Sequence, residues 1–84
     1  DDIPLEVYLD ALTQISPAAR EAAGAYLQAF QRRCNRSLTT RELRHAVADG
    51  DGDPVLMGMI RAVYQKDANA LRTLASSVSC ARRG

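Results

Sequence analysis

The stretch SLTTREL, residues 37–43, carries the clearest secondary-structure signal in this 84-residue chain. Thr39 and Glu42 have the spacing of a capping box, in which each side chain satisfies a free backbone amide at the start of a helix. Apolar residues on both sides of the cap complete a hydrophobic staple, Leu38 and Leu43. The stretch therefore predicts a helix over residues 40–48.

Two further helices are predicted where a cap residue precedes proline, at Ser16-Pro17 and Asp53-Pro54. Serine and aspartate accept hydrogen bonds from the free amides, and proline in the first turn needs no amide donor. Apolar residues recur at helical spacing after each cap, as far as Tyr64 in the last of these helices, and also after Pro4 near the chain start, as far as Ile15. These residues are predicted to form the inner faces of the helices. The predicted helices are roughly 4–14, 17–34, 40–48 and 54–66.

The segment after residue 66 has two interpretations. Apolar residues keep helical phase as far as Val78, which is compatible with one helix over residues 54–78. Asp67 disfavours a helix interior and can instead cap a separate helix over residues 68–78. We favour a break near residues 66–68. The chain as a whole is then predicted to be all-α, a small bundle of four to five helices that forms a single domain over residues 1–84.

Composition excludes several classes of function. The net charge of +1 lacks the strong basic excess of a polyelectrolyte-binding protein. No apolar run approaches the roughly 18 residues of a membrane-spanning helix, so membrane insertion is not expected. One histidine and scattered carboxylates give no catalytic constellation. We therefore expect no enzymatic activity, no cofactor and no metal.

The acidic run Asp49-Gly50-Asp51-Gly52-Asp53 resembles the start of a calcium loop. With Asp49 in the first position of an EF-hand, Pro54 would occupy the glycine position and Ile60 the position of the bidentate carboxylate. Neither residue can perform that role. The run is better explained as a turn, in which Gly50 ends one helix in a left-handed conformation and Asp53 caps the next.

The two cysteines, Cys34 and Cys80, leave two interpretations open. They are either independent thiols or a disulfide, which would stabilise the fold by about 4 kcal/mol through loop-closure entropy. A disulfide would indicate an oxidising compartment. The sequence does not decide the compartment, although the cytoplasm is slightly preferred over the periplasm or secretion.

Five basic residues fall within thirteen positions: Arg32, Arg33, Arg36, Arg41 and Arg44. Cations near a helix C-terminus complement its dipole, which is the structural interpretation of the first three. The functional interpretations are contact with an acidic partner protein or with nucleic acid. Nucleic acid is not expected, because helix 54–66 is too apolar to read base edges as the second helix of a helix-turn-helix.

The run PVLMGMIRAV, residues 54–63, has more apolar residues than one buried face requires. Either this helix is central, or it carries an exposed docking face that includes Val55 and Met57. Glycines inside the predicted helices raise a similar question. Gly24 marks either close contact with another helix or a tolerated loss of helix propensity, and Gly58 would let another helix approach closely.

These observations favour a non-catalytic protein-interaction module, such as an adaptor, an inhibitor of an activator, or a chaperone-like protein. Its predicted contacts are Val55, Met57 and Met59, with the arginines orienting another protein or a second copy of the chain. One alternative is a secreted or periplasmic, disulfide-bonded accessory or immunity protein. A second alternative is a regulatory module associated with nucleic acid.

Overall fold

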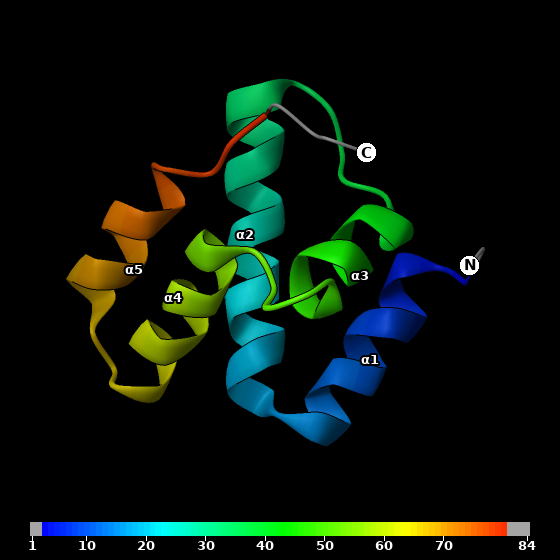
Figure 1. Ribbon diagram of the computed structural model, residues 1–84, viewed down its shortest axis with the longest axis horizontal. Helices are drawn as coiled ribbons and strands as arrows, with labels where there is room; N and C mark the ends of the chain where they lie inside the picture. The colour runs from blue at the N-terminus through cyan, green and yellow to red at the C-terminus, as the bar shows by residue number, and fades with distance from the viewer. Residues whose placement is uncertain (1–2, 81–84) are drawn as a thin grey trace.

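In the computed structural model, which describes residues 3–80, the chain forms five α-helices. They are α1 (Leu5–Ile15), α2 (Pro17–Cys34), α3 (Thr40–Ala48), α4 (Pro54–Tyr64) and α5 (Ala68–Ala75). The long helix α2 runs through the middle, with α1 and α3 on one side of it and α4 and α5 on the other (Figure 1). The predicted all-α fold is confirmed.

The caps predicted at Ser16, Thr39 and Asp53 are present. The Ser16 hydroxyl accepts a hydrogen bond from the Ala19 amide at 3.2 Å. Both bonds of the capping box between Thr39 and Glu42 form, at 3.1 and 2.9 Å. Asp53 accepts from two amides of the first turn of α4, at 2.8 and 3.3 Å. Local hydrogen bonding thus determines where α2, α3 and α4 begin.

The predicted break after α4 is also confirmed. Lys66 adopts a left-handed conformation with φ of 56°, and Asp67 caps α5 by accepting from the Ala70 amide at 3.0 Å. Both flanking helices end earlier than predicted, α4 at Tyr64 and α5 at Ala75. A non-helical segment then returns across the C-terminal end of α2 (Figure 1).

The turn from α3 to α4 has the predicted conformation. Gly50 and Gly52 have φ values of 62° and 82°, in the left-handed region that favours glycine. Asp53 also accepts a hydrogen bond from the Tyr26 hydroxyl at 2.9 Å, so the cap of α4 is tied to α2. Within residues 3–80, no cluster of three or more metal-ligating side chains occurs, in this turn or elsewhere.

The core lies between α2 and the four shorter helices. Its largest fully buried side chains come from α2, α3, α4 and the segment after α5: Tyr26, Phe30, Leu43, Leu56, Met59 and Val78. Small side chains of α2 also belong to the core, since Ala22, Ala23 and Ala29 are buried. Two apolar residues that helical spacing places with the inner faces are exposed. Ile15 and Tyr64, the last residues of α1 and α4, are 80% and 66% exposed.

The two helical glycines have different surroundings. A side chain at Gly24 would meet only the end of the flexible Arg20 side chain, at 2.9 Å. Gly24 is therefore a tolerated helix residue. A Cβ atom at Gly58 would lie 3.1 Å from Leu74 of α5. Gly58 thus allows close approach, and the helix that approaches it belongs to the same chain.

Candidate functional site

The predicted docking face on α4 is largely covered by the chain itself. Met59 is fully buried, so it belongs to the core and offers no surface to a partner. Val55 and Met57 are half-buried and pack against the core. Met57 also folds over the turn, since a Cβ atom at Gly52 would lie 3.0 Å from its terminal methyl group. The alternative of a central helix describes α4 better than an exposed face.

The arginine cluster divides into groups with different surroundings. Arg33 donates from Nε to the Val78 carbonyl at 2.8 Å, which holds the segment after α5 against α2. Arg36 forms two hydrogen bonds with the Glu42 carboxylate, at 3.1 and 2.9 Å. Its guanidinium also lies over the Phe30 ring, 4.9 Å from the centroid. Arg33 and Arg36 thus connect elements of the fold.

The Arg36 contact also affects the acidity of its partner. The hydrogen bonds from Arg36 are the largest of the effects that lower the pKa of Glu42 to about 2; burial opposes them, and the backbone hydrogen bond from Thr39 lowers the pKa further. The carboxylate therefore stays ionised at all ordinary pH values. It acts as a fixed anion that joins the segment after α2 to the start of α3.

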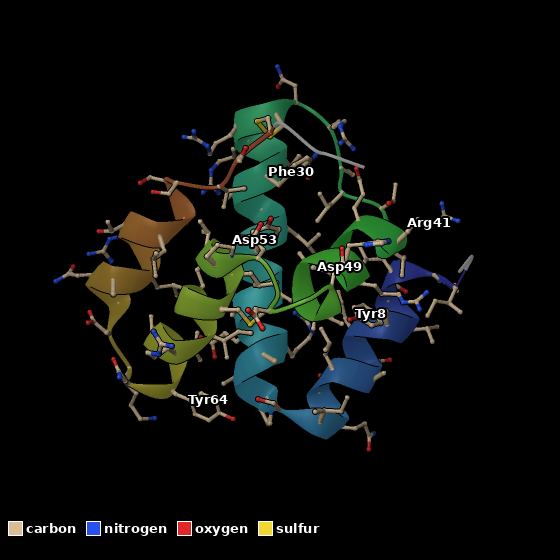
Figure 2. All side chains as sticks on the ribbon, in the orientation of Figure 1. Tyr8, Phe30, Arg41, Asp49, Asp53 and Tyr64 are labelled. Carbon is tan, nitrogen blue, oxygen red and sulfur yellow. A yellow bond between two sulfur atoms is a disulfide. The ribbon has the colours of Figure 1, made fainter. Side chains whose placement is uncertain are left out.

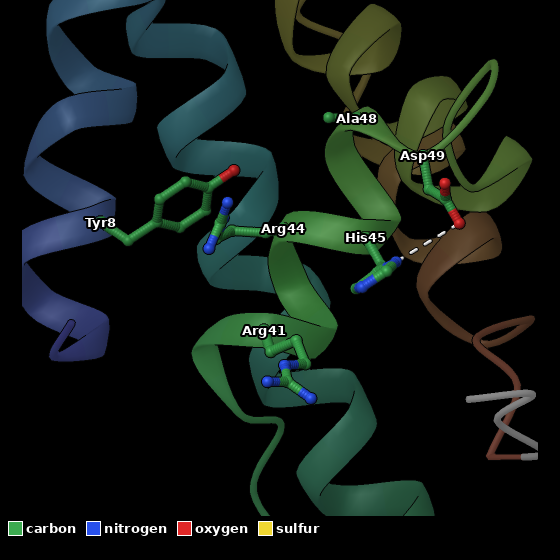
Figure 3. Close-up of a pocket in the computed structure, with 6 residues that line it drawn as sticks. All are labelled: Tyr8, Arg41, Arg44, His45, Ala48 and Asp49. Carbon is green, nitrogen blue, oxygen red and sulfur yellow. Dashed lines mark hydrogen bonds and ion pairs between the residues drawn. The ribbon is translucent and has the colours of Figure 1, made fainter. Parts of the chain in front are cut away.

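The other three arginines lie on the surface. Arg32 borders a shallow depression on α2 with Gln28, Gln31 and Asn35. Arg41 and Arg44 lie on the outer face of α3 and line a pocket of about 250 Å³ between α1 and α3 (Figure 3). Tyr8, His45, Ala48 and Asp49 complete this pocket. The single corner predicted from the sequence is therefore at least two separate surfaces.

The two cysteines form a disulfide, with Cα atoms 5.5 Å apart (Figure 2). The bond joins the last residue of α2 to Cys80, and it lies beside the hydrogen bond from Arg33 to Val78. Of the two interpretations left open by the sequence, the disulfide describes this structure.

A groove that sequence reasoning missed lies at the N-terminal end of α2, opposite the disulfide. Its volume is about 470 Å³, and it separates the start of α2 from the end of α4 and the start of α5. The apolar part of its lining comprises Pro17, Ala18, Ala62, Val63, Tyr64, Ala68 and Leu71. Glu21, Lys66 and Asp67 supply its charged groups.

Tyr64 lies at the edge of this groove. Its hydroxyl lies 3.1 Å from the hydroxyl of Ser16, the N-cap residue of α2. Ile15, which directly precedes Ser16 in the sequence, is 80% exposed. The only sequence signal for this surface is the position of Tyr64 just before the predicted helix break. The helical spacing of Tyr64 with the apolar residues before it predicted an inward position instead.

Comparisons with protein-family models, with curated proteins and with solved structures find no match to this chain. Within residues 3–80, each helix is too short or too polar to span a bilayer. Function must therefore be argued from the surfaces described above.

Proposed function

We propose that the chain is a non-catalytic protein-interaction module of an oxidising compartment, acting as an adaptor, an inhibitor or an accessory protein. The observation that carries this proposal is the exposed Tyr64 beside an apolar groove. Tyrosine is enriched at protein interfaces, since its ring supplies a large apolar contact and its hydroxyl a hydrogen bond. The proposed occupant is an apolar side chain of a partner protein, seated between α2 and α5.

The location of the groove favours a contact on one end of the bundle. Ile15 and Tyr64 are the two most exposed large apolar side chains within residues 3–80, and both belong to this end. Single exposed apolar residues are normal on a soluble protein. Two of them at the end of the bundle that carries the groove add apolar surface whose burial would favour association.

The arginines that cap α2 do not act on the same contact. They lie at the C-terminal end of α2, whereas the groove lies at its N-terminal end. A helix of 18 residues is about 27 Å long, which is more than one partner side chain can span. We therefore replace the predicted joint action of α4 and the arginines with a contact centred on Tyr64.

The disulfide supports the assignment of the compartment. Structural disulfides persist in oxidising environments and are rare in the reducing cytosol. The Cys34–Cys80 bond closes a long segment of a small protein, where loop-closure stabilisation matters most. This observation favours secretion or the periplasm over the slight initial preference for the cytoplasm.

The nucleic-acid alternative has less support. Helix α4, which would have to enter a DNA groove, packs against both α2 and α5. The volume of the groove lies within the range of about 300–1,000 Å³ that is typical of sites for small molecules. The test must therefore distinguish a partner protein from a small apolar ligand.

The test compares capture of partner proteins by three forms of the oxidised protein. The forms are the natural chain, Tyr64→Asp, and Val7→Asp as a matched control on α1. Val7 is 53% exposed and does not line the groove. We expect one partner to bind the natural chain and the Val7→Asp variant, and to bind the Tyr64→Asp variant at least about ten-fold more weakly.

Equal binding of the partner by all three forms would contradict the proposal. Binding that requires α4 to unfold would also contradict it, because the proposed surface includes the folded end of α4. Sedimentation of the purified chain tests whether a second copy of the chain occupies the groove. A dimer that dissociates on Tyr64→Asp substitution would keep the surface but assign it to a second copy of the chain. Circular dichroism checks that both exposed substitutions leave the helices intact.

A further inference from the structure

We propose that the pocket between α1 and α3 binds a tetrahedral oxyanion, such as the phosphate group of a small molecule. The pocket is lined by Tyr8 of α1 and by Arg41, Arg44, His45, Ala48 and Asp49 at and after α3. It is separate from the groove at the end of α2, so this proposal does not depend on the proposed protein contact.

The first support is the charge of the lining. Arg41 and Arg44 are three residues apart on α3, so both guanidiniums project from one face of the helix. His45 lies four residues after Arg41, is exposed, and also lines the pocket. Among the lining residues within 3–80, Asp49 is the only acidic one, and its carboxylate lies 3.3 Å from Nδ1 of His45. Within this described part of the lining, the two arginines outnumber the single carboxylate, which already has a partner in His45.

The second support is the position of Tyr8. Its hydroxyl group points from α1 toward Arg44 across the pocket (Figure 3). Partial burial raises the pKa of Tyr8, while the nearby charge of Arg44 opposes that shift. The phenol thus stays protonated at neutral pH and can donate a hydrogen bond. Donors from two helices face the same space of about 250 Å³.

This arrangement favours a phosphate-type group over a carboxylate. Guanidinium groups form paired, charge-assisted hydrogen bonds with the oxygens of phosphate. A tetrahedral anion has oxygens on several sides, so it can accept from α3 and from Tyr8 together. Arg41 and Arg44 also interact within the protein, and a bound anion would add to or replace those interactions.

The experiment titrates the whole oxidised chain with inorganic phosphate, phenyl phosphate, sulfate and acetate, each in about 100 mM chloride to screen non-specific attraction. Amide and arginine side-chain NMR signals report the site. We expect saturable shifts confined to Tyr8 and residues 41–49. Arg44→Gln should weaken phosphate binding about ten-fold or more, and Tyr8→Phe several-fold.

The matched control is Arg32→Gln, which removes an exposed arginine outside the pocket and should leave phosphate binding unchanged. A tighter complex with phenyl phosphate would identify an ester as the ligand, and equal affinity for inorganic phosphate would identify the free anion. Shifts that do not saturate would overturn the proposal. So would equal effects of the Arg32 and Arg44 substitutions, or acetate binding as tight as phosphate binding.

Discussion

The two ends of α2 differ in how the rest of the chain closes over them. At the C-terminal end, a disulfide and the Arg33 hydrogen bond join segments that are far apart in sequence, and the Arg36–Glu42 ion pair ties the loop after α2 to the start of α3. At the N-terminal end, one contact between two exposed hydroxyls links Ser16 to Tyr64, and a groove remains open. One end is cross-linked, and the other is accessible.

We infer that the two ends of α2 have different roles, one in stability and the other in binding. A chain of this length buries a limited fraction of its surface, so its stability margin is narrow. Covalent and ionic links at one end add stability without using apolar side chains. The apolar side chains exposed at the other end are then not needed for the stability of the fold. They can instead contact a partner.

The largest predicted effect comes from breaking the cross-linked end. Replacement of both cysteines by serine, or reduction of the disulfide, should lower the free energy of unfolding by about 4 kcal/mol. The physical reason is the greater conformational entropy of an unfolded chain without the Cys34–Cys80 link. Urea unfolding with and without reductant measures the effect. An unchanged midpoint would show that this end is held by packing alone.

A smaller effect is predicted for Glu42→Gln, which retains an acceptor for the capping box but removes the charge. At neutral pH the cost should be about 0.5–1 kcal/mol, as expected for a partly exposed ion pair. The folded-state pKa of Glu42 is about 2, below its ordinary value of 4.5. The ion pair therefore contributes fully above pH 4.5, and its contribution is lost as pH falls from 4.5 toward 2.

The measurement is the melting temperature of the natural chain and of Glu42→Gln between pH 7 and pH 2. The two curves should converge in the acid range. A difference that is independent of pH would mean that the glutamine variant disturbs the cap and not the charge.

The smallest predicted effect is at the accessible end. Tyr64→Phe removes only the hydrogen bond to Ser16, and both groups are exposed to water, which can replace it. The expected change in the free energy of unfolding is within about 0.5 kcal/mol. Thermal unfolding checks this value. A loss above about 1 kcal/mol would mean that Tyr64 helps hold the bundle together, and the contrast between the two ends would weaken.

Local sequence signals predicted the helix starts, because each cap depends on only a few neighbouring residues. The capping box at Thr39 and the caps at Ser16, Asp53 and Asp67 formed as expected. The helix ends were less predictable. Helix α5 stops at Ala75, and Val78 then enters the core from a non-helical segment. That path depends on Arg33 and Cys34, which lie more than forty positions earlier.

The candidate sites were predicted less well than the fold, because they depend on tertiary contacts. An apolar run such as residues 54–63 looks the same whether it is exposed or covered on several sides. Arginines that are close in sequence separate in space when a new helix begins between them, as Arg36 before α3 and Arg41 within it show by their different neighbours. Tyr64 has the helical spacing of a core residue, but it is the last residue of α4 and is exposed.

The bond between Cys34 and Cys80 makes a covalent ring that contains α3, α4 and α5, while α1 lies outside it. A protease that cuts the exposed turn at Asp49–Asp51 would therefore open the ring without releasing a fragment. The two pieces would migrate together on a non-reducing gel and separate only after reduction. Nicking in an oxidising environment would thus leave the molecule in one piece.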